Sequence, residues 1–162
     1  MNQVETQTPI HPGLFVYTVE TKPGDTIGLL TSRCHGCERH EFPPATHCPG
    51  CGSQSVSTVE LSSQASVGGS TTVMVSPPGA MTVAPYTVVV AQFPEGVSIL
   101  GLAVGDPGDV EIGSRIQSVA CEIGGKLGFA FRVVDGAITS ARSEAGRGLR
   151  QATPPPRCTT GS

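Results

Sequence analysis

The feature that most constrains this chain is a pair of short cysteine motifs. Cys34 and Cys37 are separated by two residues, and Cys48 and Cys51 repeat that spacing after an interval of ten residues. Each C-x-x-C turn lets two sulfurs reach one ion, so the four thiolates predict a tetrahedral site of the kind that Zn²⁺ prefers. Because sulfur fills all four positions, we expect a structural ion without a catalytic water. Four sulfurs also suit iron, which is the less favoured alternative.

The neighbouring histidines and the two remaining cysteines are not expected to bind this ion. His35, His40 and His47 lie in or beside the motifs, but a four-sulfur site needs no fifth ligand, so we interpret them as exposed turn residues. Cys121 falls in an apolar β pattern, where a buried cysteine usually acts as a small hydrophobic residue. Cys158 stands alone far downstream.

Beyond the cysteines, short β-prone runs alternate with glycine and proline turns. The 21 glycines and 14 prolines favour many turns over long helices. We expect strands near residues 56–61, 71–76, 86–93, 97–104, 115–123 and 127–134, with Gly68-Gly69 joining the first two. About five strands with glycine-rich corners suggest a five-stranded OB-fold barrel, since closure removes exposed edges; a small sandwich is the competing architecture.

One predicted strand does not alternate cleanly. In the run 115–123 a two-residue period places Val119, Cys121 and Ile123 on the inward face. Ile116 falls out of that phase, so we expect a β-bulge near Gln117 and Ser118.

The chain divides into four predicted parts. Residues 1–28 are polar and broken by three prolines, which indicates a flexible arm, and its apolar run 14–17 is expected to add a strand or to dock on a surface. Residues 29–55 form the metal module and residues 56–140 form the barrel. Residues 141–162 are rich in Ala, Gly, Arg, Ser, Pro and Thr and are expected to be a disordered tail.

Charge and motif content exclude several classes of function. The formal net charge is −3, so no global positive field attracts nucleic acid. No segment reaches the ~18 apolar residues of a membrane span, and no secretory leader is visible, so we expect a cytoplasmic protein. Nucleophile-elbow, phosphate-loop, dinucleotide and zinc-hydrolase motifs are absent. We therefore expect little activity from the chain alone, and a free-standing enzyme is the least favoured alternative.

The residues around the cysteines resemble a known family. Cys34-x-x-Cys37, then Phe42-Pro43-Pro44, then Cys48-Pro49-x-Cys51-Gly52-Ser53 is similar to the rubredoxin-like zinc ribbon of DUF35 proteins, which precedes an OB-fold. Downstream, Pro85 to Val89, Glu95-Gly96-Val97 with Leu100-Gly101, and Ile112-Gly113 resemble further elements of that family. The resemblance covers roughly residues 29–134.

The resemblance implies a function that the residues alone do not. It implies an accessory subunit of a thiolase-superfamily enzyme acting on acyl-CoA, in which Phe42, Pro43 and Pro44 contact the partner or the acyl-CoA. A membrane partner is not expected, because no segment is long and apolar enough to span a bilayer. A MaoC-type enoyl-CoA hydratase is the alternative partner, and a single-stranded nucleic-acid module is the alternative of another class. Two positions depart from the family: Ala45 replaces its usual Arg, and Pro23-Gly24-Asp25 replaces its usual helix before the ribbon.

Overall fold

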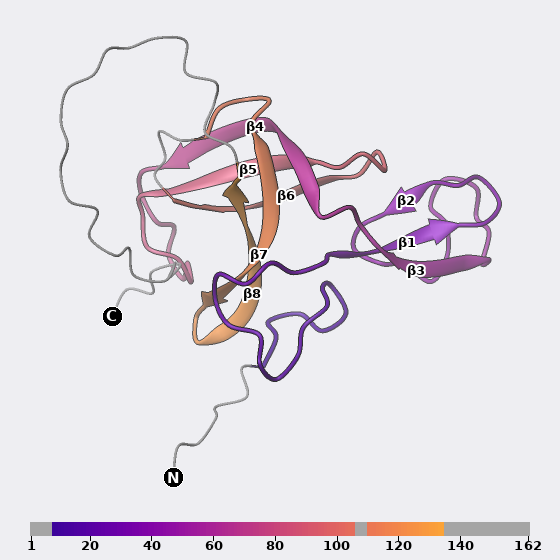
Figure 1. The fold of residues 1–162 in the computed structure, drawn as a ribbon, viewed down its shortest axis with the longest axis horizontal. Coiled ribbons are helices and arrows are strands. Elements are labelled where there is room, and N and C mark those ends of the chain that lie inside the picture. The colour runs from indigo at the N-terminus through magenta and orange to yellow at the C-terminus, as the bar shows by residue number, and fades with distance from the viewer. Residues whose placement is uncertain (1–7, 106–109, 135–162) are drawn as a thin grey trace.

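The computed structural model describes residues 8–105 and 110–134, and these form two β-sheet units. Figure 1 shows the smaller unit, with β1 to β3, projecting from one side of a barrel formed by β4 to β8. The predicted mainly-β fold, a ribbon followed by a five-stranded barrel, is confirmed. None of the described residues forms a helix that is long and apolar enough to cross a bilayer.

The smaller unit is a three-stranded antiparallel sheet in the order β2-β1-β3. Its strands are β1 (Leu30–Cys34), β2 (His40–Glu41) and β3 (Val56–Glu60). The sequence assigned the chain from residue 56 onward to the barrel. In the structure β3 instead pairs along the whole of β1, from Leu30 opposite Glu60 to Cys34 opposite Val56. The first barrel strand follows only after a short connection.

The larger unit is a closed barrel in the order β4-β5-β6-β8-β7. Neighbouring strands are antiparallel except β6 and β8, which are parallel, and β7 returns to β4 to close the barrel. Closure of five strands in this order is the OB-fold topology, and it leaves the sheet without a free edge. The strands are β4 (Gln64–Val73), β5 (Tyr86–Gln92), β6 (Ser98–Val104), β7 (Arg115–Ile123) and β8 (Lys126–Val133).

The first barrel strand differs from the sequence expectation. Gly68 and Gly69 do not join two strands; they lie inside the single strand β4, at a register shift between Val67 and Gly69. The side chain of Gln92 lies where a side chain on Gly68 would lie, 2.5 Å from its ideal Cβ position. The glycine therefore permits close packing at a bulge, and the strand bends there without ending.

The expected inward face of β7 is wrong, and so is the bulge near Gln117. Pairing with β8 runs without a shift from Ile116 to Ile123. Ile116 and Ala120 belong to the main core, whereas Val119 and Cys121 belong to a second apolar cluster with Ala130. Both faces of the strand are buried, so a two-residue period could not identify which face points into the barrel.

The N-terminal arm packs on the barrel from residue 8 onward. It has little secondary structure, as expected, but its backbone bonds to β7, with the Gly24 N–H donating to the Ala120 carbonyl at 2.8 Å and the Ile27 N–H donating to Ser118 at 3.0 Å. Within the apolar run 14–17, Phe15 is buried in the core. The run therefore docks. Residues 1–7 and 135–162, with the predicted tail and Cys158, lie outside the described residues.

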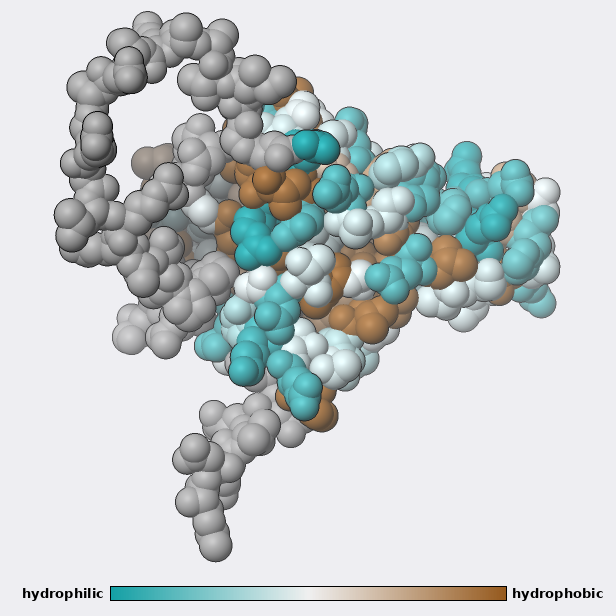
Figure 2. All heavy atoms as spheres, in the orientation of Figure 1, coloured by the Kyte–Doolittle hydropathy of each residue, from teal (hydrophilic) through white to brown (hydrophobic). Residues whose placement is uncertain are grey.

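Aromatic side chains connect the two units. Phe131 lies in the barrel core against Phe93 and Phe129. Phe42, which follows β2 in the ribbon, packs edge-to-face on Phe129 with ring centroids 6.0 Å apart. Figure 2 shows hydrophilic side chains over most of the projecting ribbon, whereas the barrel surface has hydrophobic side chains among hydrophilic ones. The ribbon is thus anchored to the barrel by a short aromatic stack.

Candidate metal centre

Two backbone turns bring the four cysteines together. Cys34 ends β1, and the turn after it passes through Glu38, whose φ of 59° is left-handed, before the Arg39 carbonyl accepts the Cys34 N–H. The second turn bonds Gly52 N–H to the Cys48 carbonyl at 2.8 Å, and Gly52 has a φ of 74°. A glycine adopts such a φ without steric cost. Each C-x-x-C motif is therefore a tight turn that directs two sulfurs to one point.

The four sulfurs have the spacing of a tetrahedral metal site. The Sγ atoms of Cys34 and Cys51 lie 3.6 Å apart, and those of Cys37 and Cys48 lie 3.5 Å apart. All four lie within 4.8 Å of one another. A zinc ion with bonds of about 2.3 Å requires sulfurs roughly 3.8 Å apart, close to this arrangement. The residues fit a closed structural zinc site, as the sequence predicted.

Backbone N–H groups of the two turns favour the thiolate form of two of the cysteines, Cys34 and Cys48. The N–H groups of Cys37 and Gly36 lower the pKa of Cys34 to about 6, against a smaller opposite effect of burial. The N–H groups of Cys51 and Gly50 lower the pKa of Cys48 in the same way. For Cys51, the Ser53 N–H favours the thiolate, but Cys34, Cys37 and burial outweigh it and raise the pKa to about 12. Metal binding must therefore displace a proton from Cys51.

The other residues singled out from the sequence lie outside the sulfur cluster. Among the described residues the four cysteines are the one group that could hold a metal ion. His35 and His47 are exposed, as expected. His40 is half-buried at the junction with the barrel, which sequence reasoning missed because its β2 neighbours are polar. Cys121 is fully buried.

The Phe42-Pro43-Pro44 segment is only partly available to a partner. Phe42 is half-buried against Phe129, Pro43 is exposed and Pro44 is half-buried. Ala45, where the related family has Arg, donates its N–H to the Ser32 hydroxyl at 3.1 Å. The segment therefore holds the ribbon on the barrel, and its contact with a partner stays a prediction.

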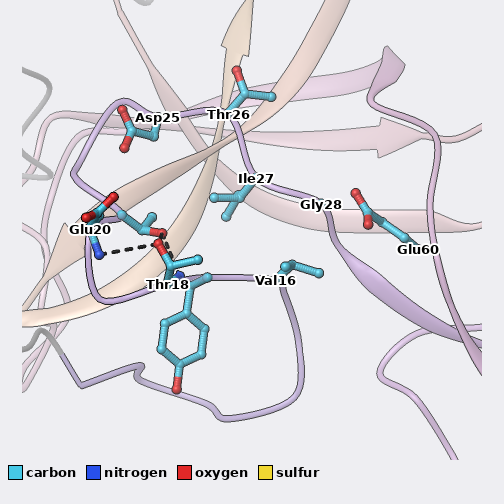
Figure 3. A pocket seen from close by; sticks show the side chains of 10 residues that line it. Val16, Thr18, Glu20, Asp25, Thr26, Ile27, Gly28 and Glu60 are labelled. Atoms are coloured by element: carbon cyan, nitrogen blue, oxygen red, sulfur yellow. Dashed lines mark hydrogen bonds between the residues drawn. The ribbon is translucent and has the colours of Figure 1, made fainter.

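A hollow of about 490 Å³ separates the arm from the ribbon. Figure 3 shows Val16, Thr18 and Glu20 of the arm on one side, and Glu60 of β3 beside Gly28 on the other. The hydroxyls of Thr18 and Thr21 bond within the arm: the Thr21 hydroxyl accepts the Thr18 N–H at 2.8 Å and the Thr18 hydroxyl accepts the Glu20 N–H at 3.3 Å. Its carboxylates do not converge on a point as the four sulfurs do. This hollow was not predicted from the sequence.

Comparison with known proteins agrees with the geometry. Residues 22–57 match the family described as the ChsH2 rubredoxin-like zinc ribbon domain. A solved structure titled Ltp2-ChsH2(DUF35) aldolase contains a similar chain, with 28% identity, a TM-score of 0.57, and coverage of 67% of this chain and 86% of that one. The chain is therefore similar to DUF35 proteins, in its zinc ribbon and over two thirds of its length.

Two further comparisons give weaker results. A DUF35 protein of unknown function from Sulfolobus solfataricus is 21% identical, with a TM-score of 0.46 over 65% of this chain and 75% of that one. Among curated proteins no sequence matches the chain. The match over the four cysteines, together with their geometry, makes the site a structural zinc site of the rubredoxin-like ribbon type.

Proposed function

We propose that this protein is a member of the DUF35 family and a non-catalytic accessory subunit of a thiolase-superfamily enzyme that processes an acyl-CoA. The observation that carries the proposal is its similarity to a chain of the Ltp2-ChsH2(DUF35) aldolase. The similarity spans 67% of the chain, which is more than the ribbon or the barrel makes up alone. In this proposal the partner performs the chemistry and the DUF35 protein supports it.

The exposed surface of the barrel supports a protein partner. OB-folds bind their ligands on the second and third strands and on the adjoining loops. Here those strands are β5 and β6, and the loop between β4 and β5 lies beside them. Five large apolar side chains of this loop and of β6 are exposed, and we refer to them as the apolar face: Met74, Val75, Met81, Val83 and Leu100, at 70%, 80%, 56%, 41% and 66%. Several large apolar side chains exposed on one loop and a neighbouring strand support a protein contact site there.

The same surface disfavours the nucleic-acid alternative. Between residues 61 and 105 the single charged residue is Glu95, and residues 56–131 contain only Arg115 and Lys126 as basic residues. Proteins that follow a nucleic-acid backbone need Lys and Arg along the groove. An uncharged apolar surface at the OB-fold binding position suits another protein better.

Affinity purification from the native host tests the proposal. Full-length tagged protein is purified beside Leu100→Asp and Val75→Asp variants, which place a charge in the apolar face. Val19→Asp is the matched control, because Val19 is 71% exposed but lies on the arm. We expect a thiolase-superfamily subunit in stoichiometric amount with the wild type and the control, and at least tenfold less with the two variants.

Three outcomes would contradict the proposal. The first is purification of the chain as a lone protein whose addition leaves thiolase-type activity unchanged. The second is purification with an enoyl-CoA hydratase, which would support the alternative partner. A salt-sensitive shift of single-stranded RNA or DNA would instead support the nucleic-acid module.

Acyl-CoA contact by the segment Phe42 to Pro44 is tested separately, by the effect of Pro43→Ala on the KM of the assembled enzyme.

A further inference from the structure

Basic residues are scarce in this chain, and one of them lies against the metal turns. Between Lys22 and Arg115 the sequence has only two basic residues, Arg33 and Arg39, and both belong to the ribbon. Arg33 is paired with Glu38 at 2.9 Å, so its charge is largely offset. Arg39 forms no ion pair within the part of the chain that the structure describes. It is therefore the unbalanced cation of the ribbon.

Arg39 connects the two C-x-x-C turns. Its backbone belongs to the first turn, because its carbonyl accepts the Cys34 N–H at 2.9 Å. Its side chain reaches the second turn, where Cζ and Nε each lie 3.1 Å from the ideal Cβ position of Gly50. Gly50 stands between Cys48 and Cys51, and its N–H is one of the groups that lower the pKa of Cys48. The guanidinium therefore lies against the turn that carries two of the four sulfurs.

The glycine under this guanidinium differs from its counterpart in the first motif. Gly36 and Gly50 are both the third residue of their motifs, and neither has a positive φ. A Cβ on Gly36 would meet nothing closer than the Cys34 sulfur, an ordinary contact at 3.7 Å, whereas a Cβ on Gly50 would press on the Arg39 side chain. The missing side chain at residue 50 therefore makes room for Arg39.

The charge of the site explains what a cation does there. Four thiolates exceed the charge of one divalent ion, so the loaded site is negative overall. Cys37 and Cys51 are exposed, so part of this charge faces solvent. A fixed positive charge beside it is attractive, and the attraction weakens as salt shortens the range of the interaction.

We propose that Arg39 stabilises the metal-loaded ribbon electrostatically, with its guanidinium held against the Cys48–Cys51 turn in the space that Gly50 leaves open. Arg39 is not a metal ligand and it moves no proton, because arginine keeps its charge at every ordinary pH. It balances part of the negative charge of the thiolates. This proposal concerns the metal site alone, and it does not depend on a partner enzyme.

Competition with a chromophoric chelator tests the proposal on the zinc-loaded full chain. At 0.1 M salt we expect Arg39→Gln to raise the zinc dissociation constant about fivefold to tenfold. The difference should shrink at 1 M salt, where the Debye length is only about 3 Å. Arg39→Lys keeps the charge and should recover most of the affinity. Lys126→Gln, which removes an exposed charge from the barrel, should bind zinc as the wild type does.

A pair of glycine variants separates charge from packing. Gly50→Ala should displace the guanidinium and weaken zinc binding to a similar extent, whereas Gly36→Ala should not. In the Arg39→Gln background Gly50→Ala should cost little more, because the group that it displaces is already absent. Wild-type zinc affinity in Arg39→Gln would overturn the proposal. A loss that persists at 1 M salt and is equal in Arg39→Lys would show a packing role and would overturn it as well.

Discussion

The ribbon and the barrel are both small β units, but they are held together by different forces. The ribbon sheet has one strand of two residues, and its most buried apolar groups include two metal ligands, Cys34 and Cys48. The barrel closes on itself and buries a continuous aliphatic and aromatic core. A short segment with little apolar area needs a metal to offset its conformational entropy, whereas a closed barrel does not. Removing zinc and removing core volume should therefore affect different units.

The largest expected effect comes from removing the metal, which should unfold the ribbon and leave the barrel folded. Cys48→Ser takes away one of four ligands, and structural zinc sites contribute about 10–16 kcal/mol of apparent binding free energy in small ribbons and fingers. We expect zinc content to fall close to zero. In correlation spectra the ribbon amide signals should lose the dispersion of a folded unit, whereas the barrel amide signals should keep it. Partner binding should be lost together with the zinc.

The control for this change lies in the same turn. His47→Ala removes an exposed side chain next to Cys48 that is not a ligand, and it should retain full zinc content. Zinc analysis and heteronuclear correlation spectra check both variants. Loss of zinc in Cys48→Ser with full partner activity would refute the role of the site as a support for partner binding.

The second prediction breaks the barrel and leaves the metal site in place. Phe131 is 1% exposed in the barrel core, and replacing a buried Phe with Ala typically costs about 3–5 kcal/mol. Phe131→Ala should lower the free energy of unfolding of the barrel by that amount in urea titrations. Leu100→Ala, on the exposed face of β6, should change it by less than about 0.5 kcal/mol; a similar loss in both variants would contradict this account of the core.

The third prediction concerns the contact between the units. Phe42→Ala removes the aromatic stack on Phe129, and such pairs contribute about 0.5–1.5 kcal/mol beyond the area they bury. We expect a modest loss of barrel stability, unchanged zinc content, and greater independence of ribbon and barrel tumbling in ¹⁵N relaxation. Phe42→Leu, which keeps apolar contact without the ring, should be intermediate. Unchanged relaxation in Phe42→Ala would show that the stack does not couple the units.

The smallest expected effect is at the connection between β3 and β4 and depends on pH. Ser62→Ala removes the hydroxyl bond to Glu95, which at this partly exposed position is worth about 0.5–1 kcal/mol. Because the folded state lowers the Glu95 pKa, the contribution is present above the ordinary Glu pKa of about 4.3 and is lost as the pH falls through the lowered value. Unfolding titrations at pH 7 and below pH 3 should show the difference at pH 7 only. Ser98→Ala should show none at either pH.

Much of this protein was predictable from short-range pattern. The spacing of Cys34, Cys37, Cys48 and Cys51 determined the metal site, because a C-x-x-C turn is a local structure that needs no distant contact. The β-prone runs between glycine and proline turns predicted β5 to β8 to within about one residue of their observed bounds. The barrel topology followed from strand count and turn chemistry together with the family resemblance.

The features that only the tertiary structure decided depend on contacts between residues that are distant in the sequence. Strand β3 belongs to the ribbon because its partner is β1, and β-propensity does not specify a pairing partner. The sequence pattern could not show which face of β7 points into the barrel, because both of its faces are buried. Glu95 and Ser62 come from two separate segments, so the bond between them has no sequence signature. Local spacing fixes a metal turn, whereas the orientation of one unit on another is set by groups that meet only after folding.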